Sequence, residues 1–460
     1  MENTVVKEEP KVVPVLSRFT TGLGMISINS IYTTVVSGFV LLYLTNIAGL
    51  NSAICGTLML VAKIFDGISD VIFGGNIDRT KSKLGHARPW VIFGSIPTSL
   101  CLVLLFMVPQ GSGWLPYAYF FIVYVLMQAV FYTATAIAVQ TLPLLITKNQ
   151  QERVSINVIG SILQIVTTVL VSGQTVRLVE TFGGGAAGWR TVAIIYAVIA
   201  MVCLFFCGGN TKELPYEMAS EDERITVSTL FKGLKTVLKN KYYVYLLIFF
   251  IAFALSQGIT SAIGAHYYIY VLGSADLMGV FSLASMSMLV GVLAAPIFVG
   301  KLGIYKTNMI SVGLSALLTI LTIPFAYARN IPMMIVMTVL RSMPGGLYNA
   351  TLYALAGDVA TYSLLKDHAQ VNALVTSTAS VGYKVGAGVG TAISGIILSL
   401  AGFSAELEVQ SAGTIGAINF TMVIVPCIIM LIMVFAMYKC NVQKGIRELK
   451  ERLAAEGSAE

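Results

Sequence analysis

Long apolar runs separated by short polar segments make up most of this 460-residue chain. A helix needs about 20 consecutive apolar residues to cross the hydrocarbon core of a bilayer. The pattern therefore predicts twelve transmembrane helices, over 20–46, 52–77, 90–109, 115–146, 154–176, 190–208, 243–271, 276–300, 307–328, 332–357, 369–401 and 413–438. Several runs are longer than the core requires, which allows their helices to tilt.

The longest polar segment, 209–242, divides the chain into two predicted halves of six helices each, 1–208 and 243–438, with a tail over 439–460. Within it, apolar residues recur at helical spacing over 224–240, which predicts an amphipathic surface helix. The halves are weakly similar, because "FGGNIDRTKSKLG" follows the second run and "FVGKLGIYKTN" the eighth. We expect an all-α membrane protein whose two pseudo-repeat halves surround a central cavity.

Composition and charge support a membrane protein and set its orientation. Hydrophobic residues make up 56% of the chain and charged residues 11%, against about 25% charged in soluble domains. With both termini in the cytoplasm, inside segments hold 23 of the 29 Lys and Arg residues. The net charge of +7 thus predicts a basic cytoplasmic face rather than nucleic-acid binding, in a multi-pass protein of the plasma or inner membrane. The N-terminus lacks signal-peptide features and is expected to stay as a cytoplasmic tail.

Two carboxylates interrupt the second apolar run, where charge is costly. Asp66 and Asp70 lie four residues apart on one helix face, and Lys63 precedes them on nearly the same face. Each ionised residue at a helix centre costs roughly 2.5–3.5 kcal/mol on insertion scales. Because like charges at this spacing repel, a bound cation, a proton or a nearby Lys must offset them. The oxygen ligands suit Na⁺, Li⁺ or H⁺. The alternative is a salt bridge between Lys63 and Asp66 that only orients the helix.

Two more cations lie inside predicted helices. Lys384 has glycines at 386, 388 and 390 beside it, which permit close helix approach. We expect it to face the carboxylates and neutralise them when no ion is bound; the alternative is that it snorkels to an interface. Arg341 either lines the cavity or pairs with an acid, and "PGG" at 344–346 could break its helix.

Polar and aromatic side chains suited to a sugar gather in the fourth, seventh and tenth runs, although each could equally serve helix packing. They include Tyr132, Thr135, Gln257, Tyr267 and Tyr348. Nucleotide-binding glycine motifs and Ser/His/Asp or metal-hydrolase spacings do not occur, so neither an enzyme nor a cofactor is expected. The six cysteines form no CxxC, and Cys203 and Cys207 are interpreted as packing residues.

Two segments carry a resemblance to a known family. "GTLMLVAKIFDGISDVIFGGNIDRTKSKLGHARPW" and, more loosely, "GDVATYSLLKDHAQVNALVTSTASVGYKVGAGVG" resemble the glycoside–pentoside–hexuronide:cation symporters, the melibiose-permease branch of the major facilitator superfamily. The resemblance implies that Asp66 and Asp70 bind the coupling cation, Na⁺ or H⁺, and that Lys384 couples cation and sugar. It also implies that a basic loop helps to close the cytoplasmic side, through Asp78, Arg79, Lys83 and Arg88.

The chain departs from that family where sugar is held. The first-helix aspartate of the family aligns with Ser30, the fourth-helix aspartate with Thr135, and a nearby tryptophan with Val139. The expected function is cation-coupled symport of a sugar or glycoside by alternating access. The alternatives are a carrier of a lysolipid or organic anion, and a non-transporting membrane sensor. The candidate substrate-binding residues are Ser30, Tyr132, Thr135, Gln257, Tyr267, Arg341, Tyr348 and Lys384.

Overall fold

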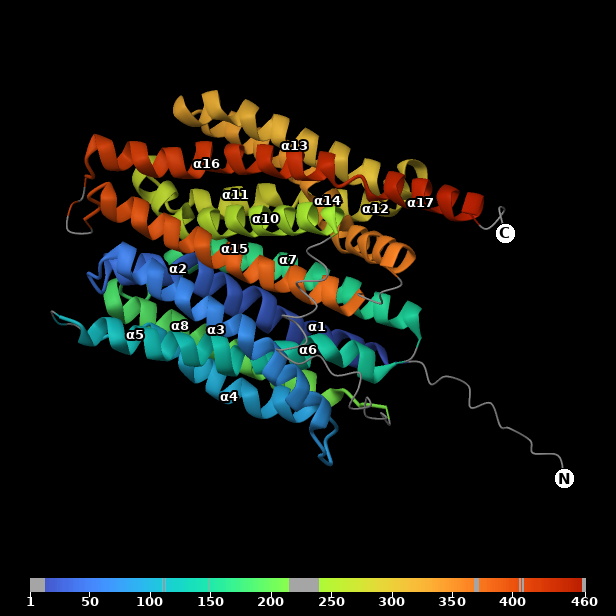
Figure 1. Ribbon diagram of the computed structural model, residues 1–460. Helices are drawn as coiled ribbons and strands as arrows, with labels where there is room; N and C mark the ends of the chain where they lie inside the picture. Colours follow the sequence, from blue (N-terminus) through green and yellow to red (C-terminus); the bar gives the residue numbers. More distant parts are fainter. Residues whose placement is uncertain are drawn as a thin grey trace.

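The computed structural model describes residues 13–109, 111, 113–147, 149–214, 240–367, 372–404, 407 and 409–456. In that part of the chain the regular structure is entirely helical. Helices of the first half lie along one side of the bundle and those of the second half along the other (Figure 1). The first half comprises α1 (Val15–Ile26), η1 (Ser27–Tyr32), α2 (Thr33–Asn46), α3 (Ser52–Arg79), α4 (Arg88–Leu105), α5 (Leu115–Val125), η2 (Leu126–Tyr132), α6 (Thr133–Ile146), α7 (Gln150–Thr181) and α8 (Gly185–Asn210).

The second half has the same character. It comprises α10 (Lys241–His266), η4 (Tyr267–Val271), α11 (Leu277–Ser285), α12 (Met288–Leu302), α13 (Ile304–Tyr327), α14 (Ile331–Asp367), α15 (Asn372–Leu400), α16 (Ala412–Lys439) and α17 (Val442–Glu456). The predicted amphipathic helix over 224–240 lies outside the described residues except for Asn240, and the boundaries predicted for the two halves stay a prediction.

Each of the twelve predicted runs falls on one helix or on consecutive helices. Ten helical segments among the described residues are long and apolar enough to cross a membrane. The other two runs fall on α3 and α14, which contain Lys63, Asp66, Asp70 and Arg341. Helix α14 continues through Pro344, so the helix break considered from the sequence is not observed. Gly346 instead allows close packing on α12, where an added Cβ would lie 2.1 Å from the Met288 carbonyl oxygen.

Three of the described helical spans contain π-helical turns. These turns, η1, η2 and η4, lie in the first, fourth and seventh predicted spans. A π turn inserts an extra residue into an α-helix and often occurs at functional sites. Thr133, the first residue after η2, has a hydroxyl that can donate its one proton either to the Gln128 carbonyl oxygen at 2.7 Å or to a carboxylate of α3. The turn therefore places a polar side chain between two helices.

The loop before α4 is held in place by an acidic residue of the segment between the two halves, 209–242, called here the inter-half segment. The carboxylate of Glu213 accepts hydrogen bonds from the backbone N–H groups of His86 (2.6 Å), Ala87 (3.0 Å) and Arg88 (2.8 Å). An anion at a helix N-terminus satisfies backbone donors and interacts favourably with the helix dipole. The Arg88 side chain completes the contact by donating to the carbonyl oxygens of Gly208 (2.7 Å) and Leu84 (3.1 Å).

Replacing Glu213 by alanine is expected to lower the free energy of unfolding by about 1–2 kcal/mol, in line with the loss of other helix caps. Thermal unfolding of the detergent-solubilised protein measures this loss as a lower midpoint. Glu448→Ala is the matched control, since Glu448 is exposed in α17 and its one ion pair within the described part of the chain is with Lys444 at 3.7 Å. Equal midpoints for the two variants would contradict the capping role of Glu213.

Candidate functional site

A cluster of four charges joins the two halves. On α3, the spacings of three and four residues place Lys63, Asp66 and Asp70 on one face. From α15, the Lys384 ammonium lies 2.8 Å from Asp66 Oδ1 and 2.7 Å from Asp70 Oδ2. The Lys63 ammonium lies 3.5 Å from Asp66 Oδ2. The Asp66 side chain is 1% exposed, whereas those of Lys63, Lys384 and Asp70 are 19%, 20% and 26% exposed. Two lysines therefore balance two carboxylates at the edge of a cavity.

Glycine makes this approach between α3 and α15 geometrically feasible. An added Cβ at Gly388 would lie 3.0 Å from the Lys63 Cβ and 3.1 Å from a Leu60 methyl group. Small residues allow helices to approach closely enough for short side-chain contacts. Lys384 therefore points at the carboxylates rather than snorkelling to an interface, which was the alternative considered from the sequence.

The cluster also contains a hydroxyl that the sequence analysis missed. Thr133 donates a hydrogen bond to Asp66 Oδ1. Asp66 Oδ2 accepts no hydrogen bond from the described residues and faces only the Lys63 ammonium. Two carboxylates and a hydroxyl form a hard-oxygen donor set of the kind that binds alkali cations or protons. In this structure the Lys384 ammonium lies where such a cation would meet both carboxylates.

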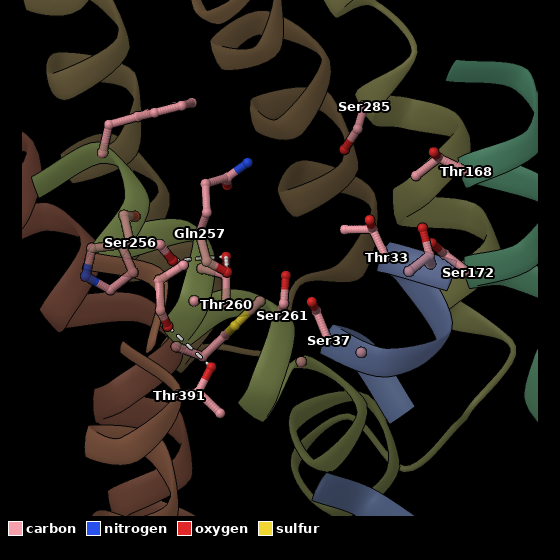
Figure 2. A pocket seen from close by; sticks show the side chains of 18 of the residues that line it. Thr33, Ser37, Thr168, Ser172, Ser256, Gln257, Thr260, Ser261, Ser285 and Thr391 are labelled. Atoms are coloured by element: carbon pink, nitrogen blue, oxygen red, sulfur yellow. Dashed lines mark hydrogen bonds between the residues drawn. The ribbon is translucent and has the colours of Figure 1, made fainter. Parts of the chain in front are cut away.

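The cluster forms part of the wall of a cavity of about 740 Å³ between the halves. Hydroxyl and amide side chains dominate its polar lining. Figure 2 shows Thr33 and Ser37 of α2, Thr168 and Ser172 of α7, and Ser256, Gln257, Thr260 and Ser261 of α10 around the same space. Cavities of this size enclose molecules of several hundred daltons. The lining also contains apolar side chains, among them Phe253, Met278 and Met430. Its many hydroxyl groups suit a hydroxyl-rich ligand.

The structure brings six of the eight predicted substrate residues to this cavity: Tyr132, Gln257, Tyr267, Arg341, Tyr348 and Lys384. Ser30 and Thr135 are not among the lining residues. Ser30 is fully buried and donates to the Gln164 carbonyl oxygen at 2.8 Å, while Thr135 donates to that of Phe131 at 2.8 Å. The Ser30 hydroxyl thus joins η1 to α7, and the Thr135 hydroxyl also lies 3.4 Å from that of Thr98 in α4. Asn29, the neighbour of Ser30, lines the cavity instead.

The residues of the predicted cytoplasmic gate lie in different surroundings. Arg79 and Lys83 are exposed at the end of α3 and in the following loop. Arg88 makes its hydrogen bonds to Leu84 and Gly208, within the first half. The side chain of Asp78 lies outside the described part of the structure. The gating role of these residues stays a prediction.

Contacts between the halves gather at one end of the bundle, named here the far end, where α2 ends and α3 begins. Arg177 of α7 donates to Asp276 at 2.5 Å, and this hydrogen bond holds the pKa of the Asp276 carboxyl below its usual range. Further hydrogen bonds there are Asn46 to Tyr270 (2.7 Å), Ser52 to the Gly395 carbonyl oxygen (2.9 Å), Asn51 to Ser399 (3.2 Å) and Thr45 with His266 (3.3 Å).

Backbone also meets backbone at the far end. An added Cβ at Gly173 of α7 would lie 2.7 Å from the Gly279 Cα of α11. At Gly395 of α15 it would lie 2.3 Å from the Ser52 carbonyl oxygen. With these glycines, the helices of the two halves touch directly, so the far end is closed by close packing as well as by hydrogen bonds.

Comparison with known proteins agrees with this architecture. The pattern of the MFS/sugar transport protein family matches residues 20–444. The chain belongs to this family. It is 29% identical over 420 residues to the isoprimeverose transporter of Lactiplantibacillus pentosus, covering 90% of this chain and 86% of that protein. It is 26% identical over 463 residues to the uncharacterized symporter YnaJ of Bacillus subtilis, covering 97% of each.

Among solved structures, the nucleoside transporter NupG superposes with a TM-score of 0.64 at 17% identity, covering 93% of this chain and 99% of that one. This likeness shows that the two chains share a fold. The predicted family, the all-helical transporter fold and the assignment to secondary active transport rather than enzymatic catalysis are thereby confirmed.

Proposed function

We propose that this protein is a symporter of the cell membrane that couples a monovalent cation, Na⁺ or H⁺, to a sugar or glycoside. One observation carries the proposal: a lysine of the second half lies between two carboxylates of the first half, beside a hydroxyl-lined cavity. The names of the relatives, an isoprimeverose transporter and a symporter, support the same function.

In this proposal the cation and Lys384 compete for Asp66 and Asp70. When a cation binds the carboxylates, Lys384 loses its partners and its ammonium turns to the cavity, where it can donate to a solute hydroxyl. The bond between the halves is thereby exchanged for bonds to cation and solute. Because the coupling free energy is reciprocal, the solute raises cation affinity by the factor by which the cation raises solute affinity.

The distribution of basic residues supports an orientation with both termini in the cytoplasm, so that the far end faces outward. The contacts at the far end then close the outer path, and the described conformation belongs to the inward side of the cycle. Opening the far end requires breaking the bonds of Asn46, Ser52 and Arg177 and separating Gly173 from Gly279.

Replacing Lys384 by glutamine is expected to raise cation affinity by about 10–100-fold, because the competing ammonium is lost and a charge-assisted hydrogen bond contributes about 1.5–3 kcal/mol. Solute accumulation should fall, since the cation no longer changes the contacts between the halves. Isothermal titration of the purified protein with Na⁺ measures the affinity for Na⁺, and a pH jump measures the affinity for protons. Lys301→Gln, an exposed residue at the end of α12, is the control. An unchanged affinity would contradict the competition.

Uptake into proteoliposomes tests the function itself. A panel of glycosides is offered with an inward Na⁺ gradient or a pH jump, alongside a lysolipid and a non-sugar organic anion. Accumulation of a glycoside with either ion supports the proposal. Accumulation of the lysolipid or organic anion alone would favour the alternative carrier, and absence of flux for every pair would favour a sensor.

A further inference from the structure

The charges on the cavity wall do not balance. Among the described residues that line it, the charged ones are Lys63, Asp66, Lys384 and Arg341. Asp70 completes the cluster through its contact with Lys384 at 2.7 Å, so the cluster has two positive and two negative charges. Arg341 is not part of it, and no carboxylate in the described part of the chain lies within 4.0 Å of its guanidinium. Counted over the described residues, the cavity thus carries one uncompensated positive charge.

Arg341 lies about halfway along the membrane-spanning part of its helix, and its exposed side chain lines the cavity. It is ten residues from Ile331, where α14 begins, which is about 15 Å along the helix axis. That distance is about half of the 30 Å hydrocarbon core. An ionised residue at this depth is rare, faces a polar cavity and marks a substrate or ion pathway. Tyr268 and Tyr348, which also line the cavity, are close enough to interact electrostatically with the guanidinium.

The chemistry of this wall selects the ligand. A guanidinium is always charged and offers donors in a planar fork that matches a carboxylate in two parallel hydrogen bonds. Hydroxyl and amide side chains, among them Ser256, Gln257 and Ser261, line the same cavity. A ligand that combines one carboxylate with several hydroxyl groups would satisfy both features.

We propose that the solute is a singly charged sugar acid, such as a hexuronide, and that Arg341 binds its carboxylate. This inference rests on the proposed cation-coupled sugar transport and specifies its substrate class. A neutral glycoside would leave the guanidinium without an ionic partner inside the membrane, whereas a uronide neutralises it and keeps the ring hydroxyls available to the Ser, Thr and Gln side chains of Figure 2.

In this proposal, the charge of the sugar acid offsets the charge that the cation adds to the cavity. The cavity with its cluster carries +1 when empty, +2 with a monovalent cation and +1 again with both cation and sugar acid. The solute therefore removes the excess charge that the cation creates, which strengthens the coupling between the two. One cation and one monoanion together move no net charge, so uptake of the sugar acid is electroneutral and independent of membrane potential.

Proteoliposome uptake of a matched pair of solutes tests this inference. Methyl β-D-glucuronide and methyl β-D-glucoside differ only in a carboxylate against a hydroxymethyl group. We expect a half-saturating concentration at least about tenfold lower for the glucuronide than for the glucoside. A K⁺ diffusion potential set with valinomycin should leave glucuronide uptake unchanged.

Two variants assign the effect to Arg341. Arg341→Gln should raise the half-saturating concentration of the glucuronide at least tenfold and leave that of the glucoside within about twofold, whereas Arg341→Lys keeps the charge without the fork and should give an intermediate value. Cation affinity of each variant, measured by titration, reports that the protein is folded. Arg447→Gln in α17, an exposed arginine away from the cavity, is the control.

The outcomes separate this inference from the proposed function. Accumulation of the glucoside, or of a sugar phosphate, in preference to the glucuronide would overturn the sugar-acid assignment and leave cation-coupled sugar transport standing. Equal loss of both methyl glycosides in Arg341→Gln would also overturn it. Absence of accumulation of any sugar with Na⁺ or H⁺ would reject the proposed function, and the sugar-acid assignment with it.

Discussion

Asp66→Asn is expected to abolish ion-driven accumulation, so that the internal concentration of solute never exceeds the external one. Asp66 contacts Lys63, Lys384 and the Thr133 hydroxyl, and its side chain is almost completely buried. The substitution leaves two lysines with one carboxylate, and removing one partner of a buried ion pair costs about 3–5 kcal/mol. The cation loses a ligand, while Lys384 keeps Asp70. Solute exchange across preloaded vesicles, which needs no net ion movement, should persist at a reduced rate.

Gradient-driven uptake and equilibrium exchange, measured on the same proteoliposomes, distinguish this outcome from simple misfolding. Asp70→Asn should show the same loss of accumulation with a smaller loss of stability, because the Asp70 side chain is 26% exposed and, among the described residues, forms an ion pair only with Lys384. Glu448→Gln on the exposed face of α17 is the surface control. If both aspartate variants still concentrated solute normally, the assignment of the cation site would be wrong.

The charged cluster could be predicted from the sequence because its signals are local. Two carboxylates four residues apart in an apolar run must share a helix face, and a lone lysine in another apolar run is the nearest available partner. Thr133 could not be predicted in the same way. Its hydroxyl reaches Asp66 because η2 inserts an extra residue just before it, and a π turn leaves no mark in the hydrophobic pattern.

More of the polar residues that line the cavity could have been predicted from the sequence. Asn29, Thr33 and Ser37 recur every four residues, as do Gln164, Thr168 and Ser172, and all six line the cavity. Such spacing places polar groups on one face of a helix that is otherwise apolar. Ser30 and Thr135 were chosen by alignment with a family position instead. Adjacent residues on a helix point about 100° apart, so an offset of one residue takes a side chain from the cavity to a helix interface.

Contacts between the halves were the least predictable part. Arg177 and Asp276 are 99 residues apart, and the hydrophobic pattern around each residue does not indicate that the other is its partner. The basic loop shows the same limit of prediction. Its charge was evident from the sequence, but the hydrogen bonds from its backbone to Glu213 depend on the path of the chain after α8. Periodicity indicates which face of a helix is buried or polar, whereas the choice of partner depends on the three-dimensional packing of all helices.

Two kinds of contact therefore hold the halves together in this conformation. The Lys384 cluster is polar and can be exchanged for a cation and a solute, whereas the far end relies on glycines that let backbone meet backbone. Alternating access requires the contacts at the far end to separate once the Lys384 cluster has been rearranged. A substitution that prevents the far end from closing should consequently trap the protein without touching the cation cluster or the cavity lining.

Gly173→Leu is such a substitution, and we expect it to reduce solute transport by about 5–150-fold. An added Cβ would lie 2.7 Å from the Gly279 Cα, a backbone atom that cannot yield as a flexible side chain would. Overpacking of a tight contact costs about 1–3 kcal/mol, which here opposes only the conformation with a closed far end. Cation binding should remain, because Asp66, Asp70 and Lys384 are untouched.

Labelling of an introduced cysteine reports the conformation. Ser172→Cys places a thiol on the cavity wall next to Gly173, and a membrane-impermeant thiol reagent added outside right-side-out vesicles should label it faster when Gly173→Leu is present. Gly313→Leu on α13 is the matched control, since an added Cβ there meets no atom within 4 Å. Transport and labelling rates equal to those of the control would show that contact between Gly173 and Gly279 is not needed to close the far end.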